Sequence, residues 1–169
     1  MRIQKHPPNT VISLKAEKFF NLIRGITIEG QFMAGFKVVN EKIKFRTHGE
    51  IDFTDITDKI QEAASASDIK NGIVHVFAPH ATGILIIEEN DFALLEDIKI
   101  FLEEIIPTHK NYRHPSNAHA HLRSMLLPPD KTLPLIDGEV AFGTWQSLFY
   151  VETDVFPRER TVIIQIMGE

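Results

Sequence analysis

The dipeptide Asp137-Gly138 is the feature that most restricts how this chain folds. It follows the apolar run at residues 133–136, and a strand-like run begins again near Val140. Asp-Gly between two such runs favours a two-residue hairpin, because both central residues of that turn take positive φ angles. The chain is therefore expected to hold at least one antiparallel strand pair.

Further runs have the alternation or β-branched composition typical of strands. Val39, Ile43 and Phe45 alternate within residues 37–46. The other predicted strands are residues 73–78, 84–87, 140–152 and 161–167. Hairpin-length connections between most of these runs indicate an antiparallel sheet.

Helical periodicity predicts helices between the strands. The first begins at Thr54 or Asp55, which can cap it, and turns Ile56, Ile60, Ala63 and Ala64 inward. A second runs from Asn90 or Asp91 to Pro107, with the following apolar stripe: Phe92, Leu95, Ile98, Phe101, Leu102, Ile105 and Ile106. A third, capped by Asn117, covers residues 118–126 with Leu122, Met125 and Leu126 inward. Two long helices and about seven short strands indicate a single α+β domain with a largely antiparallel sheet.

Residues 1–36 are predicted to be an N-terminal extension to a domain at residues 37–169. Pro7 and Pro8 oppose an early helix, whereas Ser13 can cap a short amphipathic one that ends at Gly25. Its apolar face would consist of Leu14, Phe19, Leu22 and Ile23. Packing against the domain and binding a partner are both open to such a helix.

Composition excludes several function classes. The chain has 169 residues and no cysteine, which excludes disulfides, thiol catalysis and cysteine-ligated metals. Its net charge of −5 and lack of a basic arm argue against nucleic-acid binding. No run reaches the ~20 apolar residues that span a bilayer, and no signal peptide is visible, so we expect a cytoplasmic protein without membrane contact.

Histidines gather between His114 and His121, and His80 follows an apolar run. Neutral imidazole is the commonest metal ligand, so His80, His114 and His121 can converge on one ion with a carboxylate from Glu88 or Glu89. The alternative is that each histidine only forms a hydrogen bond in a partly exposed position. Their spacing matches no zinc motif such as HExxH.

His119 and His121 are predicted to lie on different faces. In a helix they are about 200° apart, whereas in a strand they would share a face. The helix is favoured, and His121 is the residue selected for the site.

Arg158 and Arg160 flank a predicted turn, and guanidinium groups bind phosphate well. Surface salt bridges are the alternative, because Glu152 and Asp154 end the preceding strand and can either hold a metal or pair with these arginines. Trp145 lies beside Gln146 at positions suited to stacking on a planar heterocycle, although a tryptophan in a strand is usually core.

A set of short motifs occurs in an order that resembles the YjbQ-like, or secondary thiamine-phosphate synthase, family. The motifs span residues 37–168 and are His80-Ala81-Thr82, Glu89-Asn90, Tyr112-Arg113-His114, Ala120-His121-Leu122, Gly143-Thr144-Trp145-Gln146 and Glu152 with Asp154 and Pro157-Arg158-Glu159-Arg160. The chain departs from the family pattern at Ala81, at Pro128-Pro129 and at Val155-Phe156. The last two departures change loops near the predicted site.

The resemblance implies an antiparallel β-sandwich of about seven strands with two main helices, in a homotrimer about a threefold axis. It implies that a pyrimidine diphosphate is joined to a thiazole phosphate with release of pyrophosphate. A divalent metal ion, zinc, magnesium or manganese, and arginines would stabilise the departing diphosphate.

The residues expected to carry this reaction fall into three groups. The metal ligands are His80, His114 and His121; the catalytic residues are Glu89, His121, Arg158 and Arg160; the substrate contacts are Thr82, Trp145, Gln146, Arg158 and Arg160. Two other functions fit the same residues. One is a homotrimer that binds metal or a small phosphorylated molecule without catalysis, and the other is a metal-dependent hydrolase of such a molecule.

Overall fold

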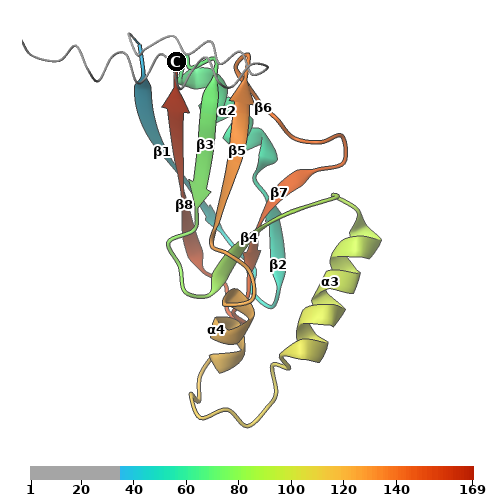
Figure 1. Ribbon diagram of the computed structural model, residues 1–169. Helices are drawn as coiled ribbons and strands as arrows, with labels where there is room; N and C mark the ends of the chain where they lie inside the picture. The colour runs from blue at the N-terminus through green and yellow to red at the C-terminus, as the bar shows by residue number, and fades with distance from the viewer. Residues whose placement is uncertain (1–34) are drawn as a thin grey trace, which may run out of the picture. The chain divides into compact units, whose positions relative to one another are not determined.

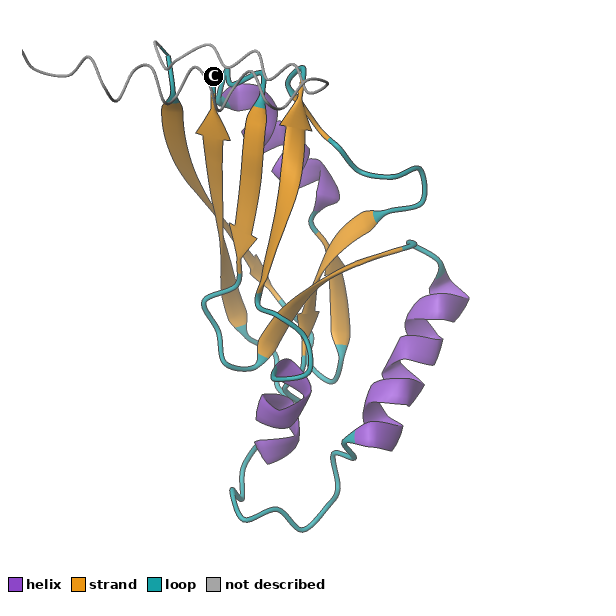
Figure 2. Ribbon diagram, in the orientation of Figure 1, coloured by secondary structure: helices purple, strands orange, loops and turns teal. Residues whose placement is uncertain are grey.

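The computed structural model describes residues 35–169. The helix predicted after Ser13 lies outside these residues. The described elements are β1 (Lys37–Arg46), β2 (Asp52–Asp55), α2 (Thr57–Ala66), β3 (Gly72–Phe77), β4 (Gly83–Glu88), α3 (Phe92–Ile105), α4 (Ala118–Ser124), β5 (Asp130–Ile136), β6 (Glu139–Val140), β7 (Ser147–Glu152) and β8 (Glu159–Gly168). The fold is α+β, as predicted, and its eight described strands form two antiparallel sheets (Figures 1 and 2).

The larger sheet has the order β1-β8-β3-β5-β6. β8 lies between β1 and β3, so that Ile166 pairs with Val39 on one side and with Val74 on the other. The predicted hairpin is confirmed: Asp137 and Gly138 have φ angles of 53° and 85° and connect β5 to β6. Both residues thus take the positive φ angles that this turn requires.

The smaller sheet, β2-β7-β4, contains a strand that the sequence did not predict. Phe53 to Asp55 pair with β7, and α2 begins two residues later, at Thr57. Asp55 still acts at the helix start, because its Oδ1 accepts a hydrogen bond from the Thr57 backbone N at 2.9 Å. The predicted helix start at Thr54 or Asp55 was wrong, because both residues belong to the four-residue strand β2.

The strand predicted at residues 140–152 is also shorter than expected. β6 ends at Val140 and β7 begins at Ser147, with a connection between them. In that connection the side chain of Gln146 accepts a hydrogen bond from the Gly143 backbone N at 2.8 Å. The chain therefore leaves the five-stranded sheet and enters the three-stranded one across this segment.

Both faces of the smaller sheet are buried, which makes two cores. Leu148 and Tyr150 of β7 face the larger sheet and α2, while Phe149 and Val151 face α3. This alternation follows from the period of two along a strand. The smaller sheet is therefore the central layer, with the larger sheet on one side and α3 on the other (Figure 1).

The predicted orientation of α3 was only partly correct. Asp91 caps the helix by accepting a hydrogen bond from the Leu94 backbone N at 2.9 Å, as predicted. Leu102 is buried, but Phe92 and Phe101 are 80% and 58% exposed. The apolar stripe is wider than the part of the sheet that α3 covers, so its outer side faces away from the core.

The predicted inward face of α4 was wrong. His119, Ala120 and Arg123 are buried, whereas Leu122 and Met125 are exposed. The helix is turned this way because Arg123 binds groups at the end of α3, as described below. Asn117 makes no side-chain capping bond, and its amide binds Asp154 instead.

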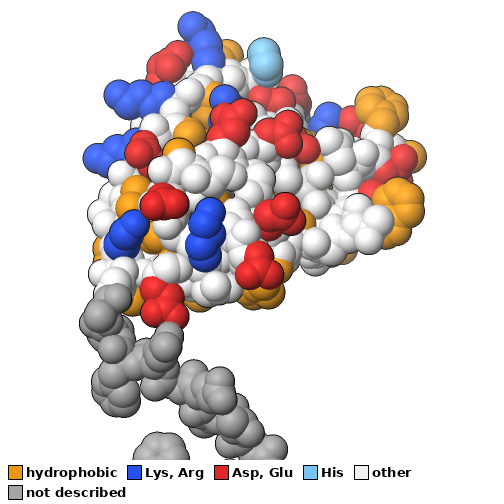
Figure 3. All heavy atoms as spheres, turned by 90° about the horizontal axis from the view of Figure 1, so that it is seen from above, with side chains coloured by type: hydrophobic (Ala, Val, Ile, Leu, Met, Phe, Trp, Pro, Cys, Tyr) orange, Lys and Arg blue, Asp and Glu red, His pale blue; other side chains and the backbone are white. Residues whose placement is uncertain are grey.

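Charged side chains of both signs are interspersed on the face seen from above (Figure 3). Hydrophobic side chains protrude at the edge of this view that corresponds to α3 and the β6–β7 connection. Within residues 35–169, no helix combines the length and the apolar character needed to cross a membrane.

Candidate functional site

A buried ion pair lies where β7 ends and β8 begins. The Arg160 Nε and Nη2 donate to the Glu152 carboxylate at 2.5 and 2.6 Å, and Glu152 has no exposed surface. Thr47 donates to the same carboxylate at 3.0 Å, while Thr82 Oγ1 accepts from Arg160 Nη2 at 2.8 Å. Burial alone would lower the pKa of Arg160, but the hydrogen bonds and charge of Glu152 raise it. Two of the predicted substrate contacts, Thr82 and Arg160, thus bind each other, and Arg160 also binds Glu152.

His80 lies beside this pair and binds backbone. Its Nε2 is 3.1 Å from the backbone N and 3.0 Å from the backbone O of Thr161, so either tautomer finds a partner there. β3 has parted from β8 before Thr161, so the His80 side chain replaces the missing strand neighbour. Burial, and then the charge of Arg160, lower the pKa of His80. His80 is therefore neutral at pH 7 and holds the sheet edge.

A chain of polar contacts connects Arg158 to the predicted histidine side of the site. Arg158 Nη2 donates to Asp154 Oδ2 at 2.8 Å, and Asn117 Nδ2 donates to the same oxygen at 3.1 Å. The Asn117 Oδ1 is in turn 3.2 Å from His114 Nε2. Asp154 is almost fully buried. Burial alone would raise the pKa of its carboxyl group, but the hydrogen bonds from Arg158 and Asn117 outweigh this effect and lower the pKa below its ordinary value, so the carboxylate is charged. Arg158 thus binds the Asp154 carboxylate directly, and His114 is connected to the same carboxylate through Asn117.

His114 and His121 are neighbours, with ring centroids 5.5 Å apart in an edge-to-face arrangement. They line an apolar groove of about 450 Å³ together with Tyr112, Arg113, Ala118 and Leu122. Two of the three predicted metal ligands are therefore brought together. In residues 35–169 no group of three or more His, Asp or Glu side chains is placed to hold a metal ion.

The remaining predicted residues lie at the opposite end of the smaller sheet. Gly83 pairs with Glu152 at one end of the β4–β7 ladder, and Glu88 pairs with Ser147 at the other. These ends are five residues apart, roughly 17 Å at the rise of a β-strand. At the far end, Glu89 follows β4, and Trp145 and Gln146 precede β7; Trp145 is 72% exposed. Within one chain they do not adjoin the histidines.

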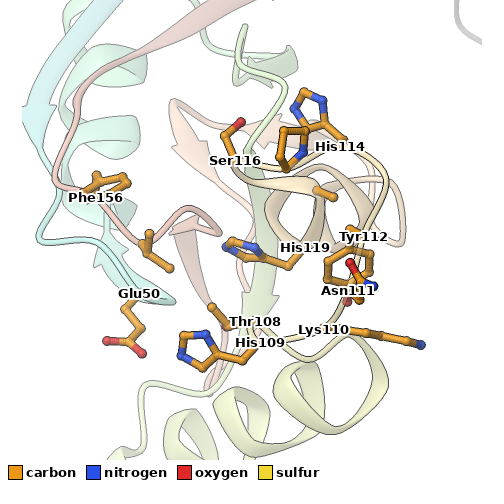
Figure 4. Close-up of a pocket in the computed structure, with 13 residues that line it drawn as sticks. Glu50, Thr108, His109, Lys110, Asn111, Tyr112, His114, Ser116, His119 and Phe156 are labelled. Carbon is orange, nitrogen blue, oxygen red and sulfur yellow. The ribbon is translucent and has the colours of Figure 1, made fainter.

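A polar cavity of about 580 Å³ lies next to the apolar groove and shares Tyr112, His114 and Ala118 with it (Figure 4). The other residues of its wall are Glu50, Thr108, His109, Lys110, Asn111, Pro115, Ser116, His119, Val155 and Phe156. The two compartments together form the candidate site, and the phenol ring of Tyr112 belongs to both.

His119 is the residue that the sequence prediction missed. It is 4% exposed, it lines the cavity, and its buried Nε2 has no hydrogen-bond partner among residues 35–169. Burial, and then the charge of Arg123, lower its pKa, so the imidazole is neutral at pH 7. The prediction that His119 and His121 do not share a face is confirmed, since His119 faces the cavity and His121 faces the groove. No feature of the sequence indicates which of these two faces of α4 is the buried one.

The wall formed by the α3–α4 connection is held by Arg123, whose side chain is fully buried. Its Nε and Nη2 donate to the Ile106 carbonyl at 3.0 and 2.8 Å, and Nη2 also reaches Thr108 Oγ1 at 2.9 Å and the Glu103 carboxylate. Glu103 accepts a hydrogen bond from the Thr108 backbone N at 2.8 Å. These contacts fix the start of the segment that carries His109 and Tyr112.

The opposite wall contains strained backbone. Glu50 and Ile51 both have φ angles of 55°, which non-glycine residues rarely adopt. Gly49, at φ 90°, packs so closely that an added Cβ would lie 2.5 Å from the Val155 carbonyl oxygen. The Glu50 backbone N donates to the Asp154 carbonyl at 2.7 Å. Strain of this kind is common at functional sites, and here it places Glu50 on the cavity rim.

Comparison with known proteins gives consistent matches. A family model described as "UPF0047 protein YjbQ-like" matches residues 41–169. A UPF0047 protein of Methanothermobacter thermautotrophicus is 37% identical over 143 residues, which cover 83% of this chain and 97% of that protein. Two crystal structures are also similar. A YbjQ-like protein of unknown function from Sulfolobus solfataricus P2 has a TM-score of 0.77 and 33% identity, over 80% of this chain and 100% of that one. A hypothetical protein from Aeropyrum pernix K1 has a TM-score of 0.74 and 32% identity, over 78% and 99%.

Proposed function

This chain belongs to the UPF0047 family of YjbQ-like proteins, and we propose that it is a secondary thiamine-phosphate synthase-like transferase. Its substrates would be a pyrimidine diphosphate and a thiazole phosphate. The observation that carries the proposal is the polar cavity beside the apolar aromatic groove, with Arg158 connected to their shared wall through Asp154 and Asn117. A small, charged, ring-containing substrate is the kind of molecule that such paired compartments accommodate.

In the proposed reaction the bond between the pyrimidine methylene carbon and the diphosphate oxygen breaks, and its electron pair leaves with the diphosphate. The thiazole nitrogen supplies the pair for the new C–N bond. Negative charge therefore grows on the leaving group, and a cation placed there lowers the barrier.

Arg158 suits this role better than Arg160. The Arg158 side chain is 45% exposed, and within residues 35–169 only its Nη2 donates a hydrogen bond, to Asp154, so that Nε and Nη1 can bind phosphate oxygens. Arg160 is committed to Glu152 and Thr82 and supports the fold of the site. His121, in the groove, is the proposed proton donor to the leaving diphosphate.

A divalent metal ion is a separate part of the proposal. His114 and His121 supply two ligands, but no third ligand joins them in the described part of one chain. The residues of a single chain therefore do not fit a complete metal site, and no step is assigned to a metal here. Elemental analysis of the purified protein and of His121→Ala tests metal binding directly, because this proposal expects the variant to lose any bound zinc, magnesium or manganese.

We also propose the homotrimer, in which the site is completed between subunits. Phe101 and Ile105 of α3 and Met125 after α4 are 58%, 48% and 74% exposed. A second copy would bury these residues, and it would provide Glu89, Trp145 and Gln146 from the far end of its smaller sheet. Light scattering of the wild type and of Phe101→Asp tests this, with a trimer expected for the first and smaller species for the second.

The activity test is formation of thiamine phosphate by the purified full-length chain, with the two substrates and each divalent ion in turn. His121→Ala should reduce the rate by at least about 100-fold if its proton transfer is essential. His75→Ala is the matched control, since His75 lies in β3 of the larger sheet and binds Thr132. No product from the wild type under any metal condition would refute the transferase. Binding of both substrates without product would support a binding protein, and release of phosphate would support a hydrolase.

A further inference from the structure

Three residues of the polar cavity have no part in the proposed transfer. The Glu50 carboxylate forms no hydrogen bond or salt bridge with other groups of residues 35–169 in this structure, although its backbone is held in a strained conformation at the rim. The His119 Nε2 is buried and has no hydrogen-bond partner within the same described range. Phe156 presents a ring that is 61% exposed to the same space.

The chemistry of these three groups is complementary to one kind of ligand. A carboxylate accepts hydrogen bonds, so the exposed Glu50 side chain at the cavity rim can bind a donor such as an amine. A neutral imidazole donates at one nitrogen and accepts at the other. His119 Nε2 can therefore donate to an unprotonated ring nitrogen in one tautomer and accept from a protonated ring nitrogen in the other. A phenyl face packs well on a second planar ring.

We propose that this cavity binds an amino-substituted nitrogen heterocycle, with Glu50 accepting from the exocyclic amine, His119 bonding to a ring nitrogen and Phe156 packing against the ring. This rests on the proposed function, since it assigns the aminopyrimidine half of the substrates to the cavity. The diphosphate would then extend toward Arg158, which shares Asp154 with the backbone that carries Glu50.

The position of the charges favours the heterocycle over a phosphate in this cavity. Glu50 would repel an anion, and the buried charge of Asp154 also acts on His119. Lys110, the lysine of the cavity wall, points away from His119 and His109 (Figure 4). Glu50 and Phe156 instead stand across the cavity from those two imidazoles (Figure 4).

Val155 and Phe156 both line the cavity, and the ring of Phe156 forms an aromatic part of its wall. Phe156→Gly removes that part of the wall while leaving Glu50 and His119 in place.

The test compares two probes that differ in one group: 4-amino-2-methylpyrimidine and 4-hydroxy-2-methylpyrimidine, which is mainly the 4-oxo tautomer. Binding to the full-length chain is measured by ligand-observed NMR titration at pH 7.5. The wild type should bind the amino probe about tenfold more tightly, the ratio expected for one charge-assisted hydrogen bond in a partly open site. Glu50→Gln should remove or reverse this preference, because its amide can donate to the oxo group.

Two matched variants separate the roles of the residues. Glu104→Gln, an exposed change on α3 outside the site, should keep the wild-type preference. Phe156→Gly should weaken both probes by a similar factor, because ring packing does not distinguish an amine from an oxo group.

Equal binding of both probes by the wild type, or an unchanged preference in Glu50→Gln, would overturn the inference. The two proposals fail separately: thiamine phosphate formation without probe discrimination leaves the transferase and refutes the heterocycle site. Probe discrimination without thiamine phosphate formation supports the heterocycle site and refutes the transferase.

Discussion

Replacing Arg123 with methionine is expected to loosen the cavity wall while keeping the fold. The side chain is fully buried and binds the Ile106 carbonyl, Thr108 and Glu103. Methionine fills a similar apolar volume but donates no hydrogen bond. The loss in free energy of unfolding therefore measures the contribution of the polar contacts of Arg123.

The magnitude follows from the exposure of each partner. Hydrogen bonds to Ile106 and Thr108 contribute about 1 kcal/mol each, and the ion pair adds under about 1 kcal/mol because the Glu103 side chain is 47% exposed. The buried Arg123 Nη1 has no hydrogen-bond partner in the part of the chain that the structure describes, and its removal offsets about 1 kcal/mol of the loss. The net expected loss in free energy of unfolding is therefore about 1–2 kcal/mol.

Urea unfolding followed by circular dichroism measures this loss, and hydrogen exchange locates it. Amides of residues 107–117 should exchange faster in Arg123→Met, while those of β8 should change only by the global loss. Lys99→Met is the matched control, since Lys99 pairs with Glu96 at the surface of α3, where the two side chains are 38% and 44% exposed, and it should lose less than about 1 kcal/mol. Equal losses in the two variants, or unchanged exchange at residues 107–117, would refute the reasoning.

Further predictions concern the buried groups around the site. Glu152→Gln should destabilise the fold by about 3–5 kcal/mol in urea unfolding, because the buried Arg160 loses its counter-charge; a loss below 1 kcal/mol would show that water reaches the pair. Gly83→Ala should cost at least about 2 kcal/mol of thermal stability, because the new Cβ would lie 1.9 Å from the Tyr150 hydroxyl; an unchanged melting temperature would contradict that packing. Since the folded state lowers the pKa of His119, the unfolded chain takes up its proton first, and stability should fall as pH drops below about 6.5. His119→Gln should flatten that part of the plot of urea midpoint against pH, and an unaltered slope would assign it to other groups.

The sequence predicted the parts of the fold that local pattern determines. The alternation of Val39, Ile43 and Phe45 located β1, and the Asp137-Gly138 turn located the β5–β6 hairpin. β2 was missed because its pairing partner is β7, far away in the chain, and because its residues also suit a helix start.

The site was predictable only in its components. Arg158, His114 and His121 do gather near one end of the sheets. Arg160 binds Glu152, the ion pairing that the sequence analysis gave as the alternative, and His80 binds the Thr161 backbone, which no spacing rule indicates. His119 could not be chosen over His121, because the burial of one face of α4 is decided by the contacts of Arg123 with α3. Long-range packing of this kind leaves no periodic signal in the sequence.

The place of β8 between β1 and β3 has a consequence for biosynthesis. Lys37 of β1 pairs with Gly168 of β8, so β1, the first described strand, can form its ladder of backbone hydrogen bonds only after β8 has been synthesised. β3 also lacks its β8 neighbour until then and can pair only with β5. Because such distant contacts form slowly, the nascent larger sheet exposes free strand edges for most of its synthesis, which is when a chaperone would have its greatest effect on yield.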